Sequence, residues 1–385
     1  MMGITTYKEE SLMTSIIYVG MDVHTTNFTV CAYRIGRESV FGETSFTASA
    51  ENIAVYLETL RYNEENPKDI KFICGYEAGC LGYSLYRELS EKGIECKILA
   101  PSTMATSPLD SRKKNDRLDA QRIAKCLAFG TYKNVYVPDE EDDAVKEYIR
   151  MRDDVNAELK RVKQQITAFC VRHNKIYDGT KHKWTNQHRL WLKTLIFESK
   201  TLREVLDEYL LHLKQLEEKI ATYDKRITEF AGENRYKESV CKLSCLKGIA
   251  THTALSLVSE VGDFHRFPTA QHFSSYLGLT PGEHSSGNSQ HSLGITKAGN
   301  SHLRSLLVEA AQCFSRGAVG QKSAALKARQ EGNSGAIIQY ADRANERLRR
   351  KYMRITMRSS SNIAKTAIAR ELACFIWGLM TDHIS

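Results

Sequence analysis

The chain has 385 residues, enough for two or three domains that each bury a hydrophobic core. Its formal net charge of +8 favours a polyanionic partner such as nucleic acid, although charge by itself says nothing about the fold. The ten cysteines form no paired CxxC motif, no signal peptide is recognisable, and no apolar run could span a membrane, so we expect a cytoplasmic protein with reduced thiols.

The first third of the chain alternates between strand and helix patterns. An apolar run at 15–21 predicts a buried strand that ends at Asp22, and residues 1–14 before it are interpreted as an N-terminal extension. Further strands are predicted at 27–33, 39–46, 70–76 and 94–99, and helices at 52–61, 81–92 and 118–129. Three strands in series, then alternating helices and strands, predict an α/β domain with a mixed sheet at residues 15–140, in the order expected of a ribonuclease H-like domain.

Four acidic residues stand where such a sheet would bring them together. Asp22 ends the first strand, Glu77 follows the fourth, and Asp116 and Asp119 lie one turn apart at the start of a helix. Four carboxylates at close range repel one another unless a hard cation lies between them, and Mg²⁺ prefers such oxygen ligands. The set therefore predicts a Mg²⁺ site that handles phosphates, whereas any one of these acids alone is better explained as a surface residue.

Cations surround the last two of these acids. Segment 111–125 includes Lys113, Lys114, Arg117 and Arg122. Cations beside metal-binding acids predict contact with a nucleic-acid backbone, and the alternative is an ordinary solvated helix face.

Residues 141–235 carry the pattern of long helices. Apolar residues recur at steps of three and four over 155–169 and again over 202–230, the second time for about four heptads. This period predicts a coiled coil, formed either by a hairpin within one chain or between two subunits. We expect it to serve architecture and dimerisation.

Residues 236–385 predict a helical domain built around a serine-rich loop. Segment 243–258 has the pattern of a helix, a turn that contains Gly248 and a second helix, which predicts either a phosphate-binding helix-hairpin-helix or a plain helical turn. Ser285 and Ser286 follow a Gly-Leu-Thr-Pro turn, and Lys297 and Arg304 come after them. A hydroxyl beside cations is what attack on a phosphodiester requires, although such a Gly/Ser cluster is also typical of a solvated turn.

Two other features of this region concern charge and cysteine. Segment 342–358 holds seven cations against two acids, which predicts a phosphate-contacting surface that includes Arg347, Arg350 and Lys351. The cysteines at 241 and 245, with a histidine at 252, offer only three ligands at a spacing unusual for zinc, so we interpret them as core thiols.

Taken together, several segments resemble the transposases of the insertion sequence 110 family, in particular the subgroup typified by insertion sequence 1111, and the related pilin-gene invertases. The motifs that carry the resemblance are YVGMDVH at 18–24, YEAG at 76–79, KNDRLDA at 114–120, GLTP at 278–281, SSG at 285–287 and GITKAGN at 294–300. The similarity extends over about residues 15–380, and its specificity lies in the combination of these motifs.

The resemblance implies a DNA recombinase guided by a bridge RNA that pairs with target and donor DNA. It implies a RuvC-like domain whose DEDD set would be Asp22, Glu77, Asp116 and Asp119, a coiled coil, and a transposase domain in which Ser286 attacks the DNA strand, with Ser285 as the neighbouring alternative. It also implies a homo-oligomer, either a dimer or a tetramer on DNA. Relatives often carry a Lys/Arg run after the Ser-Gly pair, whereas this chain has Asn-Ser-Gln-His-Ser at 288–292, which leaves the phosphates to Lys297 and Arg304.

Other functions remain compatible with the same residues. A metal-dependent RuvC-like nuclease or junction resolvase would use the four acids with water instead of Ser286, and it would leave no covalent adduct with DNA. A non-catalytic RNA-binding scaffold would use only the basic segments. An actin-like ATPase is disfavoured because His24 occupies the place of a phosphate-loop glycine.

Overall fold

The computed structural model describes residues 15–37, 39–64, 67–79, 81–104, 115–179, 183–286 and 289–384, with backbone alone at 102, 283–286 and 289–292. These residues form two compact units that divide between Val137 and Pro138. The predicted extension at 1–14 lies outside the described residues. In the described part of the chain, no helix combines the length and apolar content that crossing a bilayer demands.

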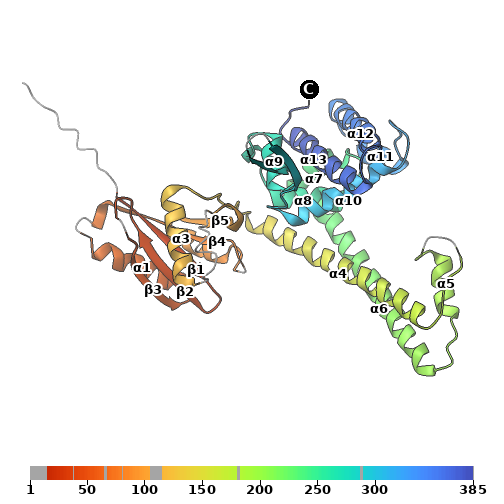
Figure 1. Cartoon of the computed structure of the whole chain (residues 1–385), viewed down its shortest axis with the longest axis horizontal. Coiled ribbons are helices and arrows are strands. Elements are labelled where there is room, and N and C mark those ends of the chain that lie inside the picture. Colours follow the sequence, from red (N-terminus) through yellow and green to blue (C-terminus); the bar gives the residue numbers. More distant parts are fainter. Residues whose placement is uncertain are drawn as a thin grey trace, which may run out of the picture. The chain divides into compact units, whose positions relative to one another are not determined.

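The first unit is a five-stranded mixed sheet with helices on both faces (Figure 1). Its strands are β1 (Ser15–Val23), β2 (Asn27–Tyr33), β3 (Phe41–Thr47), β4 (Ile70–Glu77) and β5 (Cys96–Leu99), and its helices are α1 (Ala50–Tyr62), α2 (Ser84–Glu91) and α3 (Asp116–Phe129). The strand order is β3-β2-β1-β4-β5, with β1, β2 and β3 antiparallel and with β4 parallel to both β1 and β5. The predicted mixed α/β sheet is therefore confirmed, with boundary shifts of a few residues.

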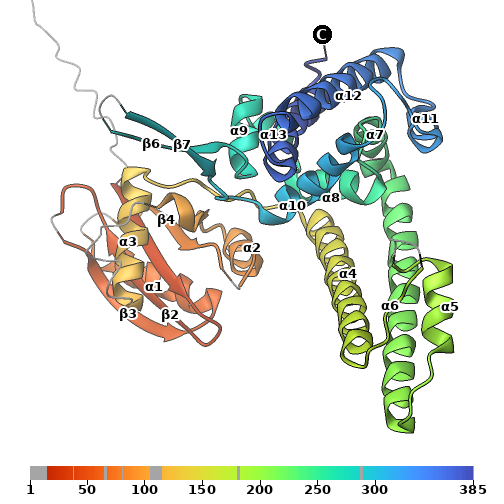
Figure 2. The ribbon, with the colours of Figure 1, turned by 45° about the vertical axis from the view of Figure 1, so that its right-hand side comes forward.

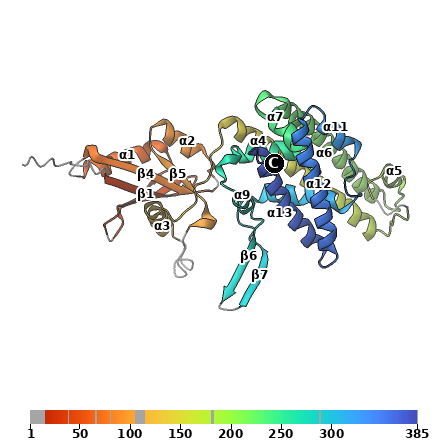
Figure 3. The ribbon, with the colours of Figure 1, turned by 90° about the horizontal axis from the view of Figure 1, so that it is seen from above.

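Side-chain alternation along β1 decides which helices cover which face. Ile17, Val19 and Met21 are fully buried in one cluster with residues of α1 and α2, whereas α3 packs on the other face (Figure 3). On that face a Cβ at Gly20 would lie 2.1 Å from the carbonyl oxygen of Ala120. The backbone of α3 thus approaches β1 more closely than any residue with a side chain would allow.

The second unit begins with two long helices that pack side by side (Figures 1 and 2). These are α4 (Glu140–Arg172) and α6 (Lys200–Gly232), and the short α5 (Asn186–Thr194), which we did not predict, packs beside them. Leu159, Ile166, Leu206 and Leu213 lie in their shared core. Of the two arrangements that the sequence allowed, the structure has the hairpin within one chain.

The rest of the second unit is a helical core with one projecting hairpin of strands. Its elements are α7 (Asn234–Ser244), α8 (Thr251–Val261), α9 (Ala270–Tyr276), β6 (Pro281–Ser286), β7 (Ser289–Ile295), α10 (Ser301–Ala311), α11 (Ala324–Gln330), α12 (Gly335–Thr356) and α13 (Ser361–Met380). The expected serine-rich loop is instead an antiparallel hairpin, β6–β7, which projects from the helices (Figure 3). The loop prediction was wrong here because the proline, glycines and glutamate of these strands are residue types depleted in strands, and pairing between the two strands overrides that weak preference.

Candidate active site

The sheet brings the first two predicted acids to the same edge. Met21 of β1 and Tyr76 of β4 are paired in a parallel register, so Asp22 and Glu77 are the next residues at the carboxyl ends of neighbouring strands. Glu77 is the last residue of β4, not the residue after it as we expected. This edge of the sheet therefore carries two carboxylates.

Helix α3 supplies the other two acids. Asp116 is its first residue and Asp119 lies one turn later, while the side chain of Asn115 caps the helix by accepting a 3.0 Å hydrogen bond from the backbone N–H of Arg117. The close packing of α3 on Gly20 holds this turn against the end of β1, where Asp22 follows two residues later.

Two basic side chains, His24 and Arg122, link the four acids. The Nε2 atom of His24 lies 3.4 Å from Asp22 and 3.9 Å from Asp116. A guanidinium nitrogen of Arg122 lies 3.1 Å from both Glu77 and Asp119. The structure thus brings all four acids into one cluster, and it places Arg122 inside that cluster.

The electrostatics of the cluster follow from its composition. Burial raises the pKa of Asp22, the charge of His24 opposes this, and the negative charges of Asp116, Asp119 and Glu77 raise the pKa further. The three other carboxylates therefore contribute to the negative potential at Asp22. A divalent cation would relieve this repulsion.

The donor atoms also fit a metal ion. One ligand atom each from Asp22, His24 and Asp116 lies within 4.8 Å of the other two. Carboxylate oxygens suit a hard cation such as Mg²⁺, and a neutral imidazole suits Mn²⁺ or other transition metals better. We did not predict His24 as a ligand, but its position two residues after Asp22 on one strand end, hence on the same side, was a usable signal.

Of the other cations predicted in this unit, only Arg117 is described, and it pairs with an acid outside the cluster. Arg117 pairs with Glu43 of β3, which also accepts a hydrogen bond from Gln121. Lys113 and Lys114 lie outside the described residues. Nucleic-acid binding by these three cations and by Arg122 stays a prediction.

In the second unit, the two ends of the β6–β7 segment are joined by backbone hydrogen bonds. The N–H of Lys297 donates to the carbonyl of Gly278 at 3.1 Å, and the N–H of Asn300 donates to that of Tyr276 at 2.9 Å. Gly278 and Gly299 have φ angles of 66° and 115°, and a Cβ on Gly299 would lie 2.1 Å from the Tyr276 oxygen. Gly278 of the GLTP motif and Gly299 of the GITKAGN motif thus allow the backbone to close at the base of the hairpin.

Ser286 is the last residue of β6, paired in register with Ser289, so its backbone lies at the outer end of the hairpin. The side chains of Ser285 and Ser286 are outside the described part. Of the two cations assigned to phosphate binding, Lys297 is exposed at the hairpin base, whereas a guanidinium nitrogen of Arg304 donates a 2.9 Å hydrogen bond to the carbonyl of Leu277.

The cations of the basic helix α12 are partly engaged in ion pairs. Arg347 lies 2.6 Å from Glu371 of α13, and Lys351 pairs with the same carboxylate. Arg350 lies 3.0 Å from Glu346 one turn earlier, and its side chain is 68% exposed. All three remain predicted phosphate ligands.

A partly buried charge network, which we did not predict, joins α4 to the base of the hairpin. His302 of α10 bonds Asp153 of α4 at 2.8 Å and also bonds Glu260 of α8, whose side chain is 3% exposed. Asn300 donates a 2.6 Å hydrogen bond to Glu260, and His252 lies 3.0 Å from Asp153. His252 is therefore part of this network, and of the two cysteines near it in sequence Cys245 is buried and Cys241 exposed.

The two carboxylates keep His302 protonated. Although burial favours the neutral ring, bonding to Asp153 and Glu260 raises the pKa of His302 to about 9. The same contacts lower the pKa of Asp153 and of Glu260 against the effect of burial.

We therefore expect His302→Gln to destabilise the second unit in a pH-dependent way. A histidine with a raised pKa contributes its full stabilisation below its unfolded pKa and loses it as pH rises through the folded value near 9. At pH 6.5 the loss should be on the order of 3 kcal/mol, and it should shrink above pH 9.5.

All three tryptophans lie after residue 138, so tryptophan fluorescence during urea unfolding follows this unit. His265→Gln is the matched control, because His265 is exposed beside Asp263 and its loss should cost less than about 0.5 kcal/mol. An equal His302→Gln penalty at both pH values would contradict the proposed charge of His302.

Comparison with known proteins gives matches over both units. Residues 19–173 match a family model described as Transposase, of the DEDD type of IS110, and residues 241–327 match the model described as Transposase IS116/IS110/IS902 family. The protein y4qE of Sinorhizobium fredii, whose name describes it as a transposase, is 33% identical over 370 residues, which cover 95% of this chain and 88% of that protein.

Two further relatives are similar over most of their length. The transposase for insertion sequence element IS1533 of Leptospira borgpetersenii is 29% identical over 87% of this chain and 95% of the relative. The transposase for insertion sequence element IS1111A of Coxiella burnetii is 25% identical over 97% of this chain and 92% of the relative. The first family model spans all four acids, and the second spans the β6–β7 hairpin.

Proposed function

Since this chain belongs to the IS116/IS110/IS902 family of transposases, we propose that it moves an insertion sequence by cutting and rejoining DNA with a metal-dependent DEDD centre. The observation that carries this proposal is the convergence of Asp22, Glu77, Asp116 and Asp119 at one edge of the sheet. As a transposase, the chain is an enzyme that acts on DNA.

The acids would hold the metal ion, and His24 lies close enough to Asp22 and Asp116 to contribute a nitrogen ligand. A bound divalent cation such as Mg²⁺ supplies positive charge to the phosphate undergoing substitution. Asp22 and Asp116 provide oxygen ligands within reach of one ion. Arg122 holds Glu77 and Asp119 in a fixed arrangement through its paired contacts.

We further propose Ser286 as the nucleophile. Its hydroxyl oxygen would form an ester with the scissile phosphorus while the bond from phosphorus to the leaving deoxyribose oxygen breaks. The serine proton would pass to solvent, and the leaving oxygen would take up a proton. The end-of-strand position of Ser286 on a projecting hairpin supports this role, because a nucleophile must reach a phosphate on the outside of DNA.

A bridge RNA would choose the sites. In this proposal base pairing to target and donor DNA supplies the specificity, while cations such as Lys113, Lys114, Arg117 and Arg350 contact backbones. The protein would act as a homo-oligomer, either a dimer or a tetramer on DNA.

The DEDD centre equally favours a second candidate, a nuclease or junction resolvase that uses water. Both candidates need the acids, and they differ in the fate of the strand. Transfer through serine conserves the phosphodiester energy in a protein–DNA ester, whereas hydrolysis releases it.

A reconstituted strand-transfer reaction tests the proposal. Purified protein, DNA with the element's ends and RNA transcribed from its non-coding flank should give joined products with Mg²⁺. Chelation with EDTA should remove the activity, and excess Mg²⁺ should restore it, because the acids repel one another without a cation. Products formed in EDTA would contradict the metal centre, and equal site choice without the RNA would contradict the guide.

A further inference from the structure

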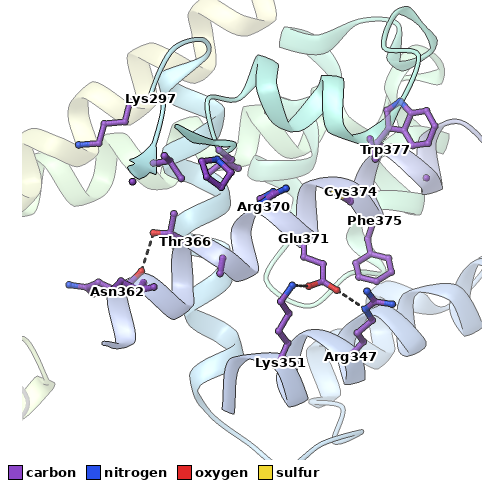
Figure 4. Close-up of a pocket in the computed structure, with 18 of the residues that line it drawn as sticks. Lys297, Arg347, Lys351, Asn362, Thr366, Arg370, Glu371, Cys374, Phe375 and Trp377 are labelled. Atoms are coloured by element: carbon purple, nitrogen blue, oxygen red, sulfur yellow. Dashed lines mark hydrogen bonds and ion pairs between the residues drawn. The ribbon is translucent and has the colours of Figure 1, made fainter. Parts of the chain in front are cut away.

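A large groove lies beside the base of the β6–β7 hairpin in the second unit (Figure 4). Its volume is about 1010 Å³, and its lining comes from the hairpin base, α12 and α13. The described residues that line this groove include neither the four acids nor Ser286.

One part of the lining is apolar and accessible. Ile363 lines the groove with 59% of its surface exposed, and Ala367 and Phe375 follow on the same helix. An exposed apolar wall is costly in water, so it favours a ligand with a flat or apolar surface.

The polar part of the lining is strongly cationic. Lys297, Arg347, Lys351 and Arg370 line the groove, and Glu371 is the one carboxylate among its described lining residues. Figure 4 shows Lys297 on the hairpin side and Arg347 and Lys351 reaching Glu371 from α12. The guanidinium carbon of Arg347 also lies 5.9 Å from the centre of the Phe375 ring. Because Glu371 offsets only one of these four charges, the groove suits an anion.

An apolar wall beside cations favours an unpaired nucleic-acid strand over a duplex. A closed duplex offers phosphates but hides its base faces, so it gains nothing from an apolar wall. An unpaired strand offers phosphates and bare base faces together, and proteins bind it with cations beside aromatic and apolar side chains.

The hairpin side of the groove indicates which strand this is. Leu279, Pro281 and Ile295 line this side of the groove at the base of the hairpin. Ser286 lies on the same hairpin, at its outer end. A strand lying in the groove would therefore continue along the element that carries the proposed nucleophile.

We propose that this groove binds an unpaired segment of substrate DNA, with phosphates on Lys297, Arg347, Lys351 and Arg370 and with bases against Ile363 and Phe375. The choice of DNA rests on the proposed role of Ser286, because the strand beside a nucleophile is its substrate.

Binding of short labelled oligonucleotides to the full-length protein tests this proposal. Fluorescence anisotropy in EDTA excludes cleavage and compares single-stranded DNA, its duplex, and RNA of the same sequence. Arg370→Gln should weaken single-stranded DNA binding several-fold and reduce the slope of log K against log salt by about 0.7, the value for one lost phosphate contact. Phe375→Leu should weaken it about tenfold with no change in slope, because it removes a stacking surface and no charge.

Two further variants complete the design. Lys327→Gln removes an exposed cation of α11 that does not line the groove, so it should leave single-stranded binding unchanged. Ile363→Ser changes the exposed apolar lining, and it replaces Phe375→Leu in the experiment if thermal unfolding shows that Phe375→Leu does not fold. It should also weaken binding without changing the slope.

The outcomes separate the groove from the wider function. Normal single-stranded binding by Arg370→Gln and Ile363→Ser would overturn the groove proposal, as would an equal loss for duplex, or a loss confined to RNA. None of these results depends on the nucleophile, since no strand is cut. Conversely, full activity of Ser286→Ala would overturn the serine mechanism and leave the measured binding in the groove as it stands.

Discussion

Asp119→Asn is expected to lower metal-dependent strand cleavage by about a hundred- to a thousand-fold. The amide keeps the shape of the carboxyl group but loses its charge, and it is a poorer ligand for a hard cation. It also leaves Arg122 with only Glu77 of its two acidic partners. Cleavage rates measured over a range of Mg²⁺ concentrations should show both a lower maximum and a higher Mg²⁺ requirement.

A matched control for this variant is available in the same unit. Glu58 is an exposed acid beside Arg61 on α1, which covers the opposite face of the sheet from α3, so Glu58→Gln removes the same charge outside the cluster. It should cleave like the wild type. If Asp119→Asn and Asp116→Asn both retain the wild-type Mg²⁺ dependence, the acids do not bind the catalytic metal.

Ser286→Ala is expected to abolish strand transfer while the fold and RNA binding persist. The substitution removes a single hydroxyl at the end of β6, and a side chain without a nucleophilic oxygen forms no ester with phosphorus. Wild-type protein stopped in denaturant should carry covalently attached DNA, visible as a labelled protein band on a denaturing gel. The Ser286→Ala protein should carry none, a loss of at least about a thousand-fold in product.

Ser285→Ala is the neighbouring control for this experiment. Retained adduct in Ser285→Ala and loss in Ser286→Ala would support the assignment, and the reverse result would move the nucleophile by one residue. An active enzyme without any adduct would favour the hydrolytic alternative. Mixing Ser286→Ala with Asp119→Asn protein then tests the oligomer, because subunits that supply one function each should regain part of the activity.

Much of the first unit followed from local patterns. The run at 15–21, the alternation at 27–33 and the acids after each strand end depend on residues close in sequence, and period-two and period-3.6 patterns report such elements directly. The clustering of Asp22 and Glu77 was also predictable, because parallel neighbours end at the same edge. The hairpin at 281–295 was not, since its polar residues show no strand pattern and its strands are stabilised by their pairing.

The sequence by itself determined the order of the elements in the first unit, the choice of the four candidate acids and the cationic character of α12. Only the tertiary structure decided which partner each charge takes. Arg122, which we also predict to contact a phosphate, bridges Glu77 and Asp119, and His302 joins Asp153 and Glu260 although 149 residues separate it from Asp153. Ion pairs at such separations leave no periodic signal, because they depend on the packing of whole helices and strands. Gly20 is the clearest case: its lack of a side chain has meaning only once α3 lies against it.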